Sequence, residues 1–129
     1  PVPAVPRPAP KVVLVVDDSP MIRDVVTAVV SQMGHEVRQA ANGREALASA
    51  MAKAPDLVIL DLHMPEMSGL EMLAEMRRLS NLQAVPVVLL TSVRSTLVIT
   101  KATTYGVHDY LSKPARPARI REKVRKYLR

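Results

Sequence analysis

The sequence predicts an α/β fold, a (βα)5 doubly wound sheet of five parallel strands with helices on both faces. Two observations predict this class. Short apolar runs recur along the chain, as in strands that are buried on both faces. Each run is followed by a stretch in which apolar residues recur at helical spacing. Such an alternation of strand and helix is typical of a parallel sheet covered on both faces.

The first strand and helix show the pattern clearly. Residues 12–16 form an apolar run that ends in two acids. Asp18 or Ser19 then offers an N-cap, Pro20 suits the first helical turn, and Gly34 ends the helix. The other strands are expected at 35–38, 57–60, 87–90 and 109–111, and the other helices at 44–52, from 69 onward, at 96–105 and at 117–128.

Composition excludes several classes of function. The 129 residues suit one domain, and no apolar run approaches the roughly 18 residues of a membrane span, so no membrane association is expected. The lack of cysteine excludes disulfides and agrees with a reducing, cytoplasmic location. The lack of phenylalanine and tryptophan argues against stacking on single-stranded nucleic acid.

The net charge of +6 is concentrated in one segment. Residues 115–129 contain seven basic residues and one acid, whereas residues 1–114 are neutral. Any argument about an acidic partner therefore concerns the last helix alone. We interpret its basic residues as a solvated face beside an apolar stripe, with an acidic protein surface as the expected partner and nucleic acid as a less favoured one.

The first ten residues differ in composition from the rest. Residues 1–10 hold five of the eleven prolines and should be extended, as a linker or as the edge of an expressed fragment. We expect residues 11–129 to form one domain that is joined in the full-length protein to another module.

Polar residues follow the strands at the edge where parallel sheets bind ligands. Asp17 and Asp18 follow the first strand, Asp61 follows the third, Thr91 ends the fourth, and Lys113 comes after the fifth. Three neighbouring carboxylates repel one another, and Mg²⁺ with its preference for oxygen ligands relieves that repulsion. Thr91 and Lys113 can bind phosphate oxygens. Because no glycine-rich nucleotide loop is present, one of the acids is expected to become phosphorylated.

These residues carry a resemblance to a known family. The matching segments are VVDDS at 15–19, DLHMPEMSG at 61–69, LTS at 90–92 and DYLSKP at 109–114. On these segments, the chain from Lys11 to about Leu128 resembles the response-regulator receiver domain, the CheY-like phosphoacceptor module of two-component signalling. The resemblance, and not the spacing of the strands, implies a flavodoxin-like strand order 2-1-3-4-5.

The resemblance assigns roles to the residues of the site. It implies that Asp61 accepts a phosphoryl group from a histidine kinase or a phosphotransfer domain. It implies that Asp18, Asp17, Asp61 and the backbone carbonyl of His63 hold Mg²⁺, Asp17 partly through water. Lys113 would pair with the phosphoryl oxygens.

A second group of roles concerns signal output. The resemblance implies that Thr91 moves toward the phosphoryl group, that Tyr110 turns inward with it, and that the Lys113–Pro114 bond is cis. Output would pass to a protein target through the face formed by the fourth helix, the fifth strand and the last helix, or through a homodimer.

Several alternatives stay open. Asp17 and Asp18 could be a simple capping pair, Tyr110 a half-buried strand residue, and the side chain of His63 a metal ligand or a general base. The domain could be a degenerate receiver that acts only as a phosphorylation-independent interaction module. A Mg²⁺-dependent phosphohydrolase is disfavoured, because that class usually carries an acid at the position of His63.

Two features depart from the family pattern. Ala115 stands where relatives often have phenylalanine, which removes packing beneath the last helix. The helix at 96–105 is rich in β-branched residues, which form helices poorly. We therefore expect this helix to be short or mobile.

Overall fold

The computed structural model describes residues 10–64, 67–92 and 96–128, so the expected linker over residues 1–10 lies outside it except for Pro10. In the described residues, five strands alternate with five α-helices. The strands are β1 (Val12–Val16), β2 (Glu36–Ala40), β3 (Leu57–Leu60), β4 (Val87–Thr91) and β5 (Asp109–Ser112). The helices are α1 (Pro20–Gln32), α2 (Gly43–Ala52), α3 (Gly69–Arg77), α4 (Thr96–Thr104) and α5 (Pro117–Tyr127), with a short 3-10 helix, η1 (Ser80–Leu82), before β4.

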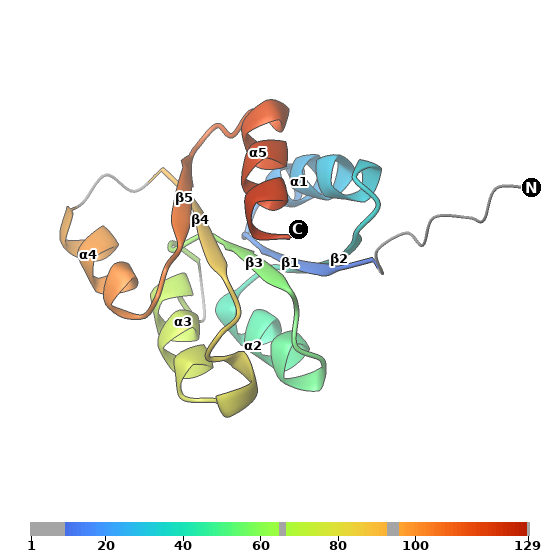
Figure 1. Cartoon of the computed structure of the whole chain (residues 1–129). Coiled ribbons are helices and arrows are strands. Elements are labelled where there is room, and N and C mark those ends of the chain that lie inside the picture. Colours follow the sequence, from blue (N-terminus) through green and yellow to red (C-terminus); the bar gives the residue numbers. More distant parts are fainter. Residues whose placement is uncertain (1–9, 65–66, 93–95, 129) are drawn as a thin grey trace, which may run out of the picture.

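The strands form one parallel sheet in the order β2-β1-β3-β4-β5. Helices α1 and α5 lie side by side on one face, and α2, α3 and α4 cover the other (Figure 1). This arrangement confirms the predicted fold class and strand order. The order reverses at β1 and β3, and the carboxyl ends of these strands therefore flank the crevice in which such sheets bind ligands.

The three central strands are buried over their whole length. Alternate side chains of β1 face opposite layers: Leu14 joins the cluster under α2 and α3, whereas Val13 and Val15 join the cluster under α1 and α5. The outer strands β2 and β5 carry exposed positions. The unbroken apolar runs in the sequence therefore correspond to the inner strands.

The start of β2 differs from the prediction. The backbone N–H of His35 donates to the carbonyl of Val30 and so still closes α1, whereas that of Glu36 donates to Lys11 and begins the pairing with β1. The strand runs to Ala40, two residues further than predicted. Its sequence carries a weak apolar signal because only Ala40 of this edge strand is buried.

Arg77, the last residue of α3, binds two turns at the amino-terminal edge of the sheet. One turn leads from η1 into β4, and the other leads from α4 into β5. Burial lowers the pKa of Arg77. Its guanidinium donates hydrogen bonds of 2.7–3.1 Å to the backbone carbonyls of Leu82, Gln83, Val85, Tyr105 and Gly106.

None of the described helices has the length and apolar character that crossing a membrane requires.

Candidate functional site

Three aspartates gather at the carboxyl ends of β1 and β3. Asp17 and Asp61 directly follow these strands. The backbone N–H of Asp17 donates to the carbonyl of Ala40 at 3.1 Å, and that of Asp61 donates to the carbonyl of Val16 at 2.9 Å. These bonds extend the sheet by one residue and fix where each side chain starts. Asp18 comes next and is exposed. One carboxylate oxygen from each aspartate lies within 4.8 Å of the others, so the predicted acids do meet.

The fully buried carboxylate of Asp17 is held from two sides. Its Oδ1 accepts a hydrogen bond of 2.9 Å from the backbone N–H of Ser19, in a local turn before α1. Its Oδ2 lies 2.7 Å from Nζ of Lys113. Arg23 on α1 donates to the backbone carbonyl of Asp17 at 2.7 Å. The sequence did not predict this contact of Arg23, because a basic residue on a helix does not by itself indicate a bond to a backbone carbonyl.

Lys113 reaches the acids from the end of β5. Its Nζ lies 3.2 Å from Oδ2 of Asp61. Its backbone N–H donates to the backbone carbonyl of Thr91 at 3.2 Å. The Lys113–Pro114 peptide bond is cis. Since the ammonium contacts both Asp17 and Asp61, it offsets part of the negative charge of the three acids.

Burial and charge act on Asp61 and Lys113 in different ways. Burial raises the pKa of Asp61, and the charge of Asp17 adds to this, while Lys113 and the backbone of His63 oppose it without reversing it. Burial alone would lower the pKa of Lys113, but the hydrogen bond to Asp17 and the charge of Asp61 outweigh burial and raise it. Burial thus dominates the shift of Asp61, whereas the two neighbouring acids dominate the shift of Lys113.

Gly69 allows α3 to pack directly on the segment that follows Asp61. Its backbone N–H donates to Leu62 at 3.1 Å. A Cβ at this position would overlap the carbonyl oxygen of Asp61 and come within 2.8 Å of the Cα of Leu62. Ser68 and Glu71 form a capping box around it. Sequence reasoning treated Gly69 only as a helix start and missed this close approach.

The remaining predicted site residues lie at the same edge of the sheet. The backbone N–H of His63 donates to Oδ1 of Asp61 at 3.3 Å, while its side chain is exposed. Thr91 is buried at the end of β4. Tyr110 on β5 is 57% exposed, so it points to solvent in this structure. The metal-ligand role of His63 and the switch roles of Thr91 and Tyr110 stay predictions.

The donor set of the acidic cluster suits a hard divalent cation. The cluster offers carboxylate oxygens from three residues, and Asp18 is open to solvent, from which such an ion would arrive with its water ligands. Mg²⁺ prefers oxygen ligands and retains several waters, whereas zinc favours nitrogen and sulfur. The residues therefore fit Mg²⁺.

The fold and the acidic site together define a class of protein, and comparison with known proteins identifies it. The family model for the response regulator receiver domain matches residues 13–125. The chain belongs to this family, the receiver domains of two-component signal transduction.

Individual relatives agree with this family. The chain is 34% identical over 117 residues to the DNA-binding response regulator MtrA of Mycolicibacterium smegmatis, covering 91% of this chain and 50% of that protein. It is 32% identical over 117 residues to RpaA of a Synechocystis species, described as a DNA-binding dual master transcriptional regulator, covering 91% and 48%. The structure of the chemotaxis response regulator CheY4 of Vibrio cholerae matches with a TM-score of 0.87 and 34% identity, over 93% of this chain and all of that one. The chain thus spans about half the length of the two curated relatives MtrA and RpaA.

Proposed function

We propose that this domain accepts a phosphoryl group on Asp61 from a phosphohistidine, carried by a histidine kinase or a phosphotransfer domain. The observation that carries the proposal is the position of Asp61. Asp61 follows the last residue of the central strand β3. Its carboxylate lies 3.2 Å from the ammonium of Lys113 and next to two further carboxylates. An acid with that surrounding can receive a phosphoryl group whose charge the site then balances.

In the proposed reaction, a carboxylate oxygen of Asp61 attacks phosphorus in line with the leaving nitrogen. A P–O bond forms, the P–N bond breaks, and its electron pair returns to the imidazole of the donor. Lys113 would follow the transferred group, because its ammonium already contacts Oδ2 of Asp61. Attack by water on the same phosphorus later returns the free carboxylate and inorganic phosphate.

Mg²⁺ is the cofactor we propose for this site. Asp17, Asp18 and Asp61 would hold it, together with the backbone carbonyl of His63. When bound, the ion supplies positive charge that neutralises the phosphoryl oxygens during transfer. Asp17 is fixed in advance for this role by its bonds to Ser19 and Lys113.

We propose that phosphorylation changes a protein-interaction surface through Thr91 and Tyr110. Thr91 ends β4 beside β5, where it pairs with Ser112, and Tyr110 lies two residues earlier on β5. A shift of Thr91 toward the phosphoryl group would leave space for the exposed ring of Tyr110 to turn inward. The surface formed by α4, β5 and α5 would then bind a downstream protein, or a second copy of the chain, in the cytoplasm.

Phosphorylation of the isolated chain tests the proposal. Incubation with a small phosphodonor and Mg²⁺ should raise the intact mass by one phosphoryl group, and Asp61→Asn should abolish the gain. Asp24→Asn is the matched control, because Asp24 is an exposed acid on α1 outside the site.

Two results would contradict the proposal. One is a mass gain that persists in Asp61→Asn. The other is the lack of any gain in the wild type with every donor, a phosphorylated kinase included, which would favour the degenerate receiver.

A further inference from the structure

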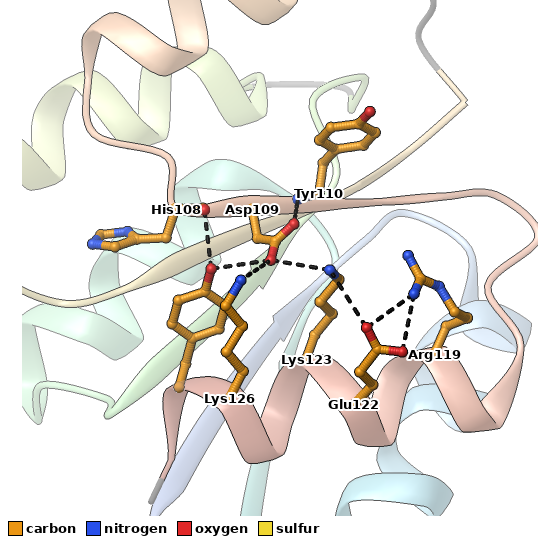
Figure 2. A network of polar contacts seen from close by, with 8 residues as sticks. His108, Asp109, Tyr110, Arg119, Glu122, Lys123 and Lys126 are labelled. Carbon is orange, nitrogen blue, oxygen red and sulfur yellow. Dashed lines mark hydrogen bonds and ion pairs between the residues drawn. The ribbon is translucent and has the colours of Figure 1, made fainter.

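The basic residues of α5 divide into two groups. Those that face β5 are neutralised within the domain (Figure 2). Asp109 lies 3.1 Å from Nζ of Lys123 and 3.3 Å from Nζ of Lys126. Arg119 pairs with Glu122 at 3.0 Å. On this side of α5, two acids thus offset most of the charge of three basic residues.

Arg121 and Arg125 form the second group, on the side of α5 that faces α1. Neither makes a hydrogen bond or an ion pair with another residue in the described part of the chain. They are four residues apart and so lie on the same side of the helix, where like charges repel. Because neither cation has a partner among the described residues, both are available to a group outside the domain.

The two arginines line a groove of about 390 Å³ between α5 and the end of α1. Gln32, Met33, His35 and Leu128 complete the lining, which contains no side-chain carboxylate of the residues that the structure describes. The Nδ1 of His35 accepts a long hydrogen bond of 3.4 Å from the backbone N–H of Lys11, which leaves Nε2 as the donor nitrogen. The side chains of the groove thus offer mainly hydrogen-bond donors beside two apolar residues.

The carbonyls that end α1 accept no hydrogen bond from Arg121 or Arg125 in the described residues. The carboxyl end of a helix attracts cations through its free carbonyls. Here the carbonyl of Val30 already accepts from the backbone N–H groups of Met33 and His35, and that of Ser31 accepts from Gly34. The charge of the groove is therefore available to a ligand.

We propose that this groove binds an acidic segment of a partner protein, with two carboxylates on Arg121 and Arg125 and an apolar side chain against Met33 and Leu128. A guanidinium binds a carboxylate through two parallel hydrogen bonds, so two arginines one helical turn apart suit two acids one turn apart. This surface lies beside the start of β2, at the edge of the sheet opposite Asp61. It is a second interaction surface, separate from the phosphorylation site.

Charge and shape favour an acidic polypeptide over nucleic acid. A nucleic acid presents a long row of phosphates and needs a basic surface of matching length. The groove instead combines two guanidinium groups with half-buried apolar residues at its ends. That combination suits a short amphipathic segment.

A peptide titration followed by NMR tests the proposal. The probe is a capped helical peptide with glutamates at positions i and i+4 beside a leucine. Its addition should shift the backbone amide signals of residues 32–35 and 121–128. The double substitution Arg121→Gln, Arg125→Gln should weaken binding about tenfold. This variant should fold normally, since the structure gives neither arginine a hydrogen bond or an ion pair with any residue of 10–64, 67–92 or 96–128.

The matched control removes the same charge elsewhere. Arg44→Gln with Lys101→Gln changes exposed residues of α2 and α4, on the opposite face of the sheet, and should leave binding unchanged. A peptide with glutamines in place of the glutamates should not bind. Equal weakening in both double variants, a lack of saturable shifts in the groove, or tighter binding of a DNA duplex to Arg121 and Arg125 would overturn the proposal.

Discussion

At the scale of single residues, the carboxylate of Asp61 occupies an environment that disfavours its charge. Only 4% of the residue is exposed, and the fully buried Asp17 lies beside it. Lys113 is shared between the two acids. The charge that suits Asp61 for its proposed reaction therefore lowers the stability of the unphosphorylated domain.

Asp61→Asn should consequently stabilise the fold at neutral pH. We expect a gain of about 1 kcal/mol in the free energy of unfolding, because the amide removes the cost of burying a charge and, to a smaller extent, the repulsion with Asp17. The pKa of Asp61 is raised in the folded state. The charge of Asp61 therefore destabilises the wild type at neutral pH, and this destabilisation disappears as pH falls through the raised pKa and the carboxylate becomes protonated. Urea unfolding should therefore show a gain near pH 7 that shrinks toward about pH 4.

Asp24→Asn serves as the control and should leave the free energy of unfolding almost unchanged. A loss of stability in Asp61→Asn at neutral pH would show that the bond to Lys113 outweighs the repulsion.

Asp109 provides a second prediction, with the opposite sign. Burial alone would raise its pKa, but the hydrogen bonds from Lys123, the backbone of Tyr110, Tyr127 and Lys126 outweigh burial and lower it to about 2. Its carboxylate therefore stabilises the fold above the ordinary pKa of 3.8, and this stabilisation is lost as pH falls toward about 2.

Asp109→Asn should cost about 1 kcal/mol of unfolding free energy at neutral pH. Urea unfolding of wild type and variant at several pH values measures this difference, which should vanish toward about pH 2. A difference that is constant over this range would mean that packing, not charge, holds β5 to α5.

The sequence predicted the main site residues because each one follows a strand. Asp17, Asp61 and Lys113 could be placed at one edge once the alternation of strands and helices was read. Arg23 and Gly69 escaped notice, because their roles depend on backbone atoms that come close only in the folded chain.

At the scale of elements, α4 differs from α3 in how firmly it packs. Four residues of α3 are buried, including Met72 and Met76. In α4, Ala102 is the buried residue among those whose burial is described. The hydroxyls of Thr103 and Thr104 bond back to carbonyls four residues earlier, which weakens helix preference.

The backbone amides of α4 should therefore exchange with solvent faster than those of α3, on the order of tenfold. Hydrogen exchange with mass spectrometry of peptides from the two helices measures this difference. Equal protection of the two helices would contradict the prediction that α4 is mobile. The length of α4, nine residues, does not test its mobility.

The predicted bounds of α2, α4 and α5 and the predicted starts of α1 and α3 agree with the structure to within one residue. Ser19 and Ser68 accept hydrogen bonds from the first turns of α1 and α3, as their sequences indicate. The short helix η1 was not predicted, because its three residues lack a side-chain cap. Its position depends on burial of Leu82 in the core, a tertiary contact.

At the scale of the whole molecule, charge separates the two edges of the sheet. The carboxyl edge holds three acids around Lys113, and the opposite edge holds the groove with Arg121 and Arg125. The excess of basic residues in the sequence therefore lies away from the acidic edge, where we propose that Mg²⁺ binds.

Mg²⁺ should stabilise the entire fold by binding the acidic edge. At about 100 times its Kd, a ligand of the folded state adds roughly 2.7 kcal/mol, which corresponds to about 10 °C in Tm for a domain of this size. Thermal unfolding with and without Mg²⁺ measures the gain. Asp17→Asn and Asp18→Asn should reduce it, and Asp24→Asn should not.

A gain that survives in all three variants would place the ion elsewhere on the protein. Calcium as a second ion separates general screening of the acids from the smaller, octahedral site that Mg²⁺ requires.

The contacts of Arg77 have a consequence for engineering the domain. One side chain satisfies carbonyls in the turn before β4 and in the turn before β5. The lengths of these two turns are therefore coupled, although more than twenty residues separate them in the sequence. A loop graft or a reporter inserted into one turn would also release the other, so the two turns have to be redesigned together.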